Sequence, residues 1–179
     1  MIETLKDIRL RPIREPEDML LLQHIFATSR DYETQAYGFP EPDLTRFLTH
    51  QFLLQHHQYM ATPDAQFYII ESLNGDPLGR FYLRQMPYPE IRVMDIAVLP
   101  AHRGKGIGKQ LFKQIMDQAE KKGQRVSIHV DQNNPSHGFY ENLGFGFVQV
   151  DGIYDLMVWP ARQTPLAKEA QQCLKKNPN

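Results

Sequence analysis

The stretch IAVLPAHRGKGIGKQLF, residues 96–112, holds the strand-to-helix junction from which the rest of the fold can be worked out. It begins as an apolar strand, breaks at Pro100 and continues as an amphipathic helix. Three cations and three glycines lie between Arg103 and Lys109, although the formal net charge of the chain is only -1. Glycines let backbone N–H groups approach a ligand, and a helix N-terminus adds partial positive charge. This turn is therefore a candidate phosphate site.

Two common phosphate-binding loops do not fit the spacing of this turn. A Walker loop requires Ser or Thr after its Gly-Lys pair, but Gly108-Lys109 is followed by Gln110. The dinucleotide fingerprint G-x-G-x-x-G needs one more residue than Gly104, Gly106 and Gly108 provide. A solvated loop leading into a helix is the alternative that needs no ligand.

The pattern on both sides of the turn alternates between strand and helix periods. Strands are predicted over 8–13, 66–72, 77–86, 91–98 and 125–130, and two more within 146–159. Helices are predicted over 15–29, 43–61, 106–123 and 135–145. The LNGDP segment is a hairpin turn between the second and third strands. The fold class is therefore α/β, a mixed sheet covered by helices.

Length and composition point to one globular domain. We expect it to cover residues 1–160, with a polar tail over 161–179 that forms at most a short helix. The net charge argues against a general nucleic-acid or membrane-surface binder. A lone cysteine, Cys173, excludes an intrachain disulfide and suits a reducing compartment.

Metal binding and membrane insertion are not expected either. No Cys/His set has zinc spacing, and the adjacent His56 and His57 are predicted to lie on a solvated helix surface. Residues 1–10 lack a continuous apolar run, and no segment approaches the length of a membrane span. We therefore expect a cytoplasmic protein.

The opening stretch closely resembles the central motif of the GNAT family of N-acetyltransferases, in which a V-x-P strand end precedes Arg/Gln-x-x-Gly-x-Gly/Ala. Residues 103–108 match this pattern position by position. A second stretch, NNPSHGFYENLGF at 133–145, resembles the family's N-P-A-x-x-F-Y-x-x-L-G-F signature, with Ser136 in place of alanine. The resemblance covers roughly residues 66–158. It implies a single-domain, mostly antiparallel sheet flanked by helices and splayed at its central strands.

Members of the family bind acetyl-coenzyme A, and the resemblance assigns cofactor-binding positions here. Backbone amides of the turn would hold the pyrophosphate, at Arg103, Gly104, Lys105, Gly106, Ile107, Gly108 and Lys109. Backbone groups of the preceding strand would pair with the pantetheine arm and the thioester carbonyl, at Ile96, Ala97 and Val98. Asn134, a natural helix N-cap before Pro135, would add a hydrogen bond to the arm. A spacing one residue longer would select Asn133 instead.

The resemblance also assigns proton-transfer roles. Tyr140 matches the family tyrosine that protonates the departing thiolate, and its ordinary pKa of about 10 keeps it protonated at neutral pH. An amine acceptor needs a base, for which His129, Asp95 and Glu90 are candidates. For each of these three, an ordinary hydrogen-bonded polar residue is the favoured alternative.

The implied activity is transfer of an acetyl group from acetyl-coenzyme A to a primary amine, by direct attack in a ternary complex. The acceptor is a small-molecule or peptide amine, and its pocket would draw on Tyr32, Tyr37, Phe39, Tyr88 and Glu90. Two other functions stay open: a non-catalytic module that binds or senses acyl-coenzyme A, and a protein that binds ATP or a dinucleotide. Whether the protein forms a homodimer is also left open.

Overall fold

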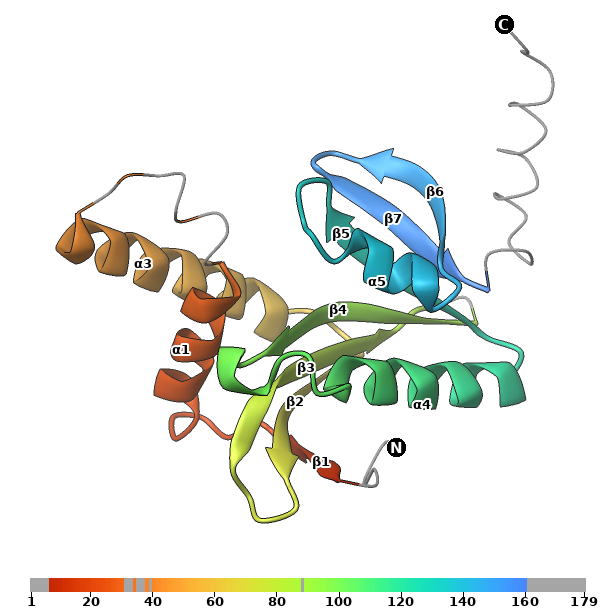
Figure 1. Cartoon of the computed structure of the whole chain (residues 1–179), viewed down its shortest axis with the longest axis horizontal. Helices are drawn as coiled ribbons and strands as arrows, with labels where there is room; N and C mark the ends of the chain where they lie inside the picture. Colours follow the sequence, from red (N-terminus) through yellow and green to blue (C-terminus); the bar gives the residue numbers. More distant parts are fainter. Residues whose placement is uncertain (1–6, 31–33, 35–37, 39, 88, 161–179) are drawn as a thin grey trace, which may run out of the picture. The chain divides into compact units, whose positions relative to one another are not determined.

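The computed structural model describes residues 7–30, 34, 38, 40–87 and 89–160 of the chain. Figure 1 shows the order of the elements along the chain. The strands are β1 (Ile8–Pro12), β2 (Ala65–Ser72), β3 (Pro77–Gln85), β4 (Glu90–Val98), β5 (Arg125–Asp131), β6 (Gly146–Asp151) and β7 (Tyr154–Trp159). The helices are α1 (Met19–Ser29), α3 (Glu41–Met60), α4 (Ile107–Lys121) and α5 (His137–Asn142), with a 3-10 turn at Pro100–His102. The predicted order of strands and helices is confirmed.

The strands form one seven-stranded sheet in the order β1-β2-β3-β4-β5-β7-β6. The β4–β5 pair is parallel, whereas β1–β2, β2–β3, β5–β7 and β6–β7 are antiparallel. The predicted class, a mixed and mostly antiparallel sheet with helices, is therefore confirmed. The chain divides into two compact units, each described below by itself: the first holds Asp95–Gln110 and the chain up to Arg84, and the second holds the rest.

The first unit is built on the antiparallel strands β1, β2 and β3 and the helices α1 and α3. The rings of Phe26 on α1 and Phe52 on α3 pack with their centroids 5.8 Å apart. Helix α1 begins at Met19, four residues later than predicted, with Asp18 as its N-cap. The prediction was wrong here because the acidic residues before Met19 were assigned to the first helical turn, whereas Asp18 binds the preceding chain.

The second unit packs α4 and α5 with the strands from β5 onward. The predicted stripe on α4 is confirmed, since Leu111, Ile115 and Ala119 are all completely buried. These residues are four apart and therefore share one face of the helix. The second unit thus has its own apolar core, which also includes Val126 on β5 and Met157 on β7.

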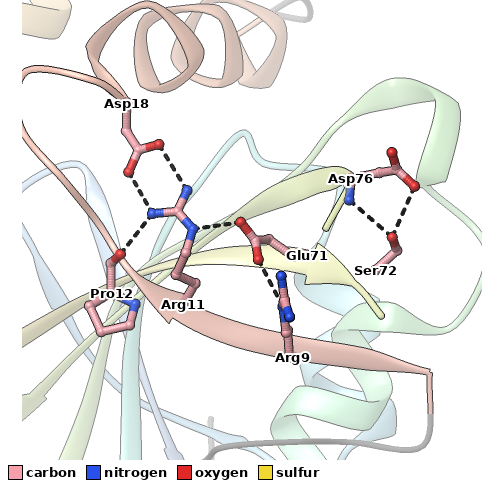
Figure 2. Close-up of polar contacts among 7 residues, drawn as sticks. All are labelled: Arg9, Arg11, Pro12, Asp18, Glu71, Ser72 and Asp76. Atoms are coloured by element: carbon pink, nitrogen blue, oxygen red, sulfur yellow. Dashed lines mark hydrogen bonds and ion pairs between the residues drawn. The ribbon is translucent and has the colours of Figure 1, made fainter. Parts of the chain in front are cut away.

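An ion-pair network fixes the start of the first unit (Figure 2). The Arg11 side chain donates from Nε to Glu71 Oε1 at 2.6 Å, and its two terminal nitrogens bind both Asp18 oxygens at 2.9 and 2.8 Å. Arg9 Nε donates to the other Glu71 oxygen at 2.9 Å. The Asp18 carboxylate also accepts the Arg14 backbone N–H at 2.7 Å. The network therefore joins β1, β2 and the entry to α1.

This network predicts a loss of stability in acid. Hydrogen bonds from Arg11 lower the pKa of Asp18 despite its burial. Burial alone would raise the pKa of Glu71, but Arg11 and Arg9 lower it below its ordinary value of 4.5. A carboxylate whose pKa is lower in the folded state stabilises the fold above its unfolded pKa, and this stability is lost as the pH falls through the folded value.

We expect Glu71→Gln to be less stable than the wild type at pH 7, and the two proteins to converge in stability below about pH 4.5. The measurement is urea unfolding of both proteins between pH 3 and pH 7. A stability difference that stays constant over this range would contradict the assignment of Glu71 as a stabilising anion.

Candidate functional site

The glycine turn lies in the first unit, between the end of β4 and the start of α4. Gly104 and Gly106 have φ values of 73° and 80°, in the left-handed region that glycine adopts most readily. A Cβ atom placed on either residue would meet no heavy atom within 4 Å. Glycine is therefore needed here for the path of the backbone rather than for tight packing, and the surface of the turn stays open.

The start of α4 supplies hydrogen-bond donors to this turn. Its first intrahelical bond runs from Gln110 N to Gly106 O at 3.0 Å. The amides of Ile107, Gly108 and Lys109 come before that bond and so have no acceptor in the preceding turn of the helix. The first turn of α4 contains no acidic residue, and the side chains of Lys105 and Lys109 are exposed. These donors and charges fit a pyrophosphate group.

Arg103 has a different role from the other cations of the turn. Its Nε donates to Val98 O at 2.9 Å and its Nη2 donates to Thr28 O at 2.7 Å. Its backbone N–H donates to Pro100 O at 3.2 Å. Thr28 lies in the last turn of α1, which contains no basic residue of its own. The Arg103 side chain therefore joins the end of α1 to the end of β4 and caps a helix carbonyl.

The end of β4 lies beyond its ladder with β5. Pairing runs from Glu90–Arg125 to Val93–Ile128 and stops there. The three predicted strand positions, Ile96, Ala97 and Val98, come after the last of these pairs and take no part in that ladder. This agrees with the prediction that the central strands splay apart.

The second motif lies in the second unit, around α5. Asn134 Oδ1 accepts the Ser136 N–H at 2.8 Å, and the Asn134 N–H donates to Asp131 O at 2.9 Å. The helix begins at His137 with Ser136 as its N-cap. The prediction that Asn134 is the N-cap was therefore wrong by two residues, because the Asn134 side chain closes a turn just before the helix. Its carbonyl oxygen is used within the protein, and its amide NH₂ group is the part suited to a ligand.

Tyr140 lies on α5 in an aromatic cluster. Its ring centroid is 5.5 Å from that of Phe112, 5.2 Å from that of Phe139 and 6.1 Å from that of Phe145, all in edge-on geometry. The residue is 6% exposed. Aromatic packing of this kind fixes the ring and leaves only a small part of the residue accessible.

His129 lies on β5 with its Nε2 3.1 Å from Asp151 Oδ2 on β6. Its ring is also in edge-on contact with Tyr154, with centroids 6.5 Å apart. Burial lowers the pKa of His129, the positive charge of Arg92 lowers it further, and Asp151 opposes both effects. The imidazole is therefore mostly neutral at pH 7, which is the form that accepts a proton.

Asp95 is the counter-ion of a buried arginine. Arg80 on β3 is 3% exposed and donates from Nη2 to Asp95 Oδ2 at 2.7 Å and to Gln55 Oε1 at 3.1 Å. Sequence reasoning did not pick out Arg80. Arg80 could have been recognised as a charged residue among the apolar residues of β3, because a buried charge needs an oppositely charged partner.

Glu90 lies at the opposite end of β4 from the glycine turn. It is 3% exposed and accepts hydrogen bonds from Ser127 Oγ at 2.6 Å, Arg125 Nε at 2.5 Å and Arg92 Nη2 at 3.2 Å. Burial alone would raise the pKa of Glu90, but these partners lower it. The structure thus places Asp95 and Glu90 in ion pairs with arginines, whereas the His129 ring contacts Asp151 and Tyr154.

Several other expectations fall outside the part of the chain that the structure describes. The acceptor-pocket residues Tyr32, Tyr37, Phe39 and Tyr88 lie there, as does the predicted tail of residues 161–179. Within the described residues, no group of three or more His, Cys, Asp or Glu side chains is arranged to hold a metal ion. Among the described helices, none has the length and apolar character needed to cross a bilayer.

Several proteins of known activity resemble this chain in amino-acid sequence. Over 82 residues the chain is 32% identical to the ribosomal protein bS18-alanine N-acetyltransferase of Haemophilus influenzae, an alignment that covers 45% of this chain and 56% of that protein. It is 30% identical over 91 residues to the streptothricin acetyltransferase of Streptomyces lavendulae, covering 49% and 48%. The chain thus spans about half the length of these curated relatives.

The fold is similar to that of PaiA N-acetyltransferase from Thermoplasma acidophilum, solved in complex with coenzyme A. The TM-score is 0.62 at 21% identity, covering 84% of this chain and 97% of that one. The profile of the acetyltransferase (GNAT) family matches residues 24–145, which include the glycine turn and the whole second motif. Since this match spans more than half of the chain, the protein belongs to the GNAT family of acetyltransferases.

Proposed function

We propose that this protein transfers an acetyl group from acetyl-coenzyme A to a primary amine, by direct attack in a ternary complex. The observation that carries the proposal is the open turn at 103–109, with two left-handed glycines, a helix N-terminus and exposed lysines. Family membership supports the same conclusion. Acetyl-coenzyme A would supply the acetyl group as a thioester, which an amine can attack.

The turn and the strand before it would hold this co-substrate. The amides of residues 104–109 would donate to the pyrophosphate oxygens, and Lys105 and Lys109 would add positive charge. The backbone of Ile96–Val98 lies outside the β4–β5 ladder and would pair with the extended arm. Asn134 would contribute its amide NH₂ group. Arg103 would act through its place in the turn, since its guanidinium binds backbone carbonyls.

Tyr140 and His129 would move the protons. A primary ammonium must lose a proton before its nitrogen can attack, and a neutral His129 can accept that proton. The Tyr140 hydroxyl would donate a proton to the departing thiolate. The acceptor would be a peptide or small-molecule amine, in keeping with relatives named for a ribosomal-protein alanine and for streptothricin.

We expect acetyl-coenzyme A and coenzyme A to stabilise the protein against heat, by about 2.7 kcal/mol at a hundred times the dissociation constant.

We expect Tyr140→Phe to keep this stabilisation and to slow acetyl transfer by about 10²-fold, because only the hydroxyl is lost. The measurements are thermal unfolding with each ligand, and thiol release in a screen of amines that includes peptides and streptothricin.

ATP and NAD serve as control ligands. Stabilisation by these two alone would replace the proposal with nucleotide binding. Stabilisation by coenzyme A species without transfer to any amine would favour the sensing module. Equal rates for wild type and Tyr140→Phe at saturating substrate would remove Tyr140 from the mechanism but leave the cofactor site in place.

A further inference from the structure

The polar groups around His129 form a connected set on the second unit. Asp151 on β6 reaches the His129 Nε2 at 3.1 Å, and the two side chains are 65% and 26% exposed. The Tyr154 ring on β7 meets the imidazole edge-on. In the sheet, β7 lies between β5 and β6: its Leu156 pairs with His129 on β5, and its Tyr154 pairs with Asp151 on β6. The His129 ring is therefore contacted by side chains from both β6 and β7.

Arg92 on β4 is held in place on the other side of β5. Its Nε donates to Ser127 Oγ at 3.2 Å and its Nη2 donates to Glu90 Oε1 at 3.2 Å. In the parallel ladder Arg92 pairs with Ser127, which is two residues before His129 and therefore on the same face of β5. The buried Glu90 fixes Arg92, so its charge has a defined position.

We propose that Asp151 and Arg92 are positioning residues for a His129 general base, Asp151 orienting the ring from β6 and Arg92 holding a fixed positive charge on the same face of the sheet. The proposal rests on the acetyl transfer proposed above. It extends that function by assigning roles to two residues that neither the motif resemblance nor the family match singles out.

The proton path follows from the geometry. The ionised Asp151 carboxylate can only accept hydrogen bonds. It therefore favours the His129 tautomer with the hydrogen on Nε2, which leaves Nδ1 unprotonated. The ammonium form of the acceptor gives one proton to Nδ1, which produces a neutral amine and an imidazolium. The positive charge then lies next to the Asp151 carboxylate, which stabilises it. No oxidant or other reactant is required.

The two positioning residues have opposite electrostatic effects. Among the charged groups that face His129, Arg92 lowers its pKa, whereas Asp151 and Glu90 raise it. Removing the Asp151 charge should therefore lower the pKa of His129, and removing the Arg92 charge should raise it. Nearby charges cause these shifts whatever the role of the residues, so a positioning role also requires that the rate of acetyl transfer changes with them.

The test compares Asp151→Asn and Arg92→Met with the wild type by NMR titration of the imidazole signals, with His129→Gln used to assign the His129 resonance. We expect the pKa of His129 to fall in Asp151→Asn and to rise in Arg92→Met. The acid limb of kcat/KM should move to lower and higher pH respectively. The rate on the plateau should fall on the order of tenfold in Asp151→Asn, because the favoured tautomer is lost.

Conservative variants separate positioning from folding. Asp151→Glu and Arg92→Lys keep the charges and should restore the wild-type acid limb. Shifts in the same direction, or no shift, in the two charge-removing variants would overturn the proposal. An acid limb unchanged in His129→Gln would also overturn it, because another group would then be the base. If the wild type transfers acetyl to no amine, the proposed function fails, while the NMR titration still tests the His129–Asp151–Arg92 arrangement.

Discussion

Replacing Asp95 by asparagine is expected to lower the free energy of unfolding by about 3–5 kcal/mol, because it leaves a buried cation without its counter-ion. Arg80 is 3% exposed and depends on Asp95 for its 2.7 Å ion pair. Its guanidinium also lies over the rings of Phe26 and Tyr82, at 5.8 and 5.3 Å, so water has little access to it. Asparagine keeps the shape of the side chain but not the charge. Urea unfolding of the two proteins measures the loss.

The matched control is Asp117→Asn on the surface of α4. Asp117 also forms an ion pair, with Lys113 Nζ at 2.6 Å, but the Asp117 side chain is 50% exposed and the Lys113 side chain 71%. An exposed pair of this kind contributes about 0.5 kcal/mol or less. The same substitution should therefore have a small effect at Asp117 and a large one at Asp95.

A second variant separates the charge from the packing. Arg80→Met in the Asp95→Asn background removes the unpaired cation and should recover part of the lost stability. If Asp95→Asn instead unfolds at the wild-type urea concentration but transfers acetyl slowly, Asp95 is a catalytic base rather than a counter-ion. The ion pair with Arg80 supports a structural role for Asp95, in keeping with the proposal that His129 is the base.

The parts of the fold that were predicted correctly are those with local signals. The α4 stripe, the LNGDP hairpin and the glycine turn each depend on residues within a few positions of one another. Periodicity, turn chemistry and left-handed glycines act over that range. The amino-acid sequence alone is therefore enough to locate the turn at 103–109 and to anticipate its open, glycine-dependent backbone.

The parts that could not be predicted depend on partners that are distant in sequence. His56 was expected to be solvated, but it is 8% exposed, with its Nε2 2.9 Å from Glu15 Oε1. The Arg103 side chain binds Thr28 O in the last turn of α1, a partner that the sequence around the glycine turn does not indicate. A charged residue in a sequence shows that a partner is needed when it is buried, but not which of many residues will supply it.

Gly79→Ala is expected to destabilise the protein by about 3 kcal/mol and to weaken coenzyme A binding at the same time. A Cβ atom on Gly79 would lie 2.1 Å from Ala97 O and 3.0 Å from Val98 Cα. Real atoms do not approach so closely, and both neighbours are backbone atoms that cannot rotate away. The β2–β3 ladder is irregular at this point, since Ile70 pairs with Gly79 whereas Glu71 pairs with Pro77.

The backbone displaced by this substitution is the segment proposed to pair with the pantetheine arm. The Leu99 N–H donates to Leu78 O at 2.8 Å, so β3 holds the end of β4 just before the glycine turn. Pushing Ala97 away from Gly79 should stretch this bond and move the donors and acceptors of Ala97 and Val98. The thermal shift caused by coenzyme A should therefore shrink more than the loss of stability alone predicts.

Gly138→Ala is the matched control for the same change of one methyl group. Gly138 lies within helix α5, where a Cβ atom would meet nothing within 4 Å. Alanine is favoured over glycine in a helix by up to about 1 kcal/mol, so this variant should be as stable as the wild type or more so. If Gly79→Ala unfolds at the same urea concentration as Gly138→Ala, β3 and β4 are not in close contact at Gly79. The increase in melting temperature caused by coenzyme A tests the second claim, that the pantetheine arm pairs with Ala97 and Val98. An increase of wild-type size in Gly79→Ala would show that binding of the arm does not depend on the position of Ala97.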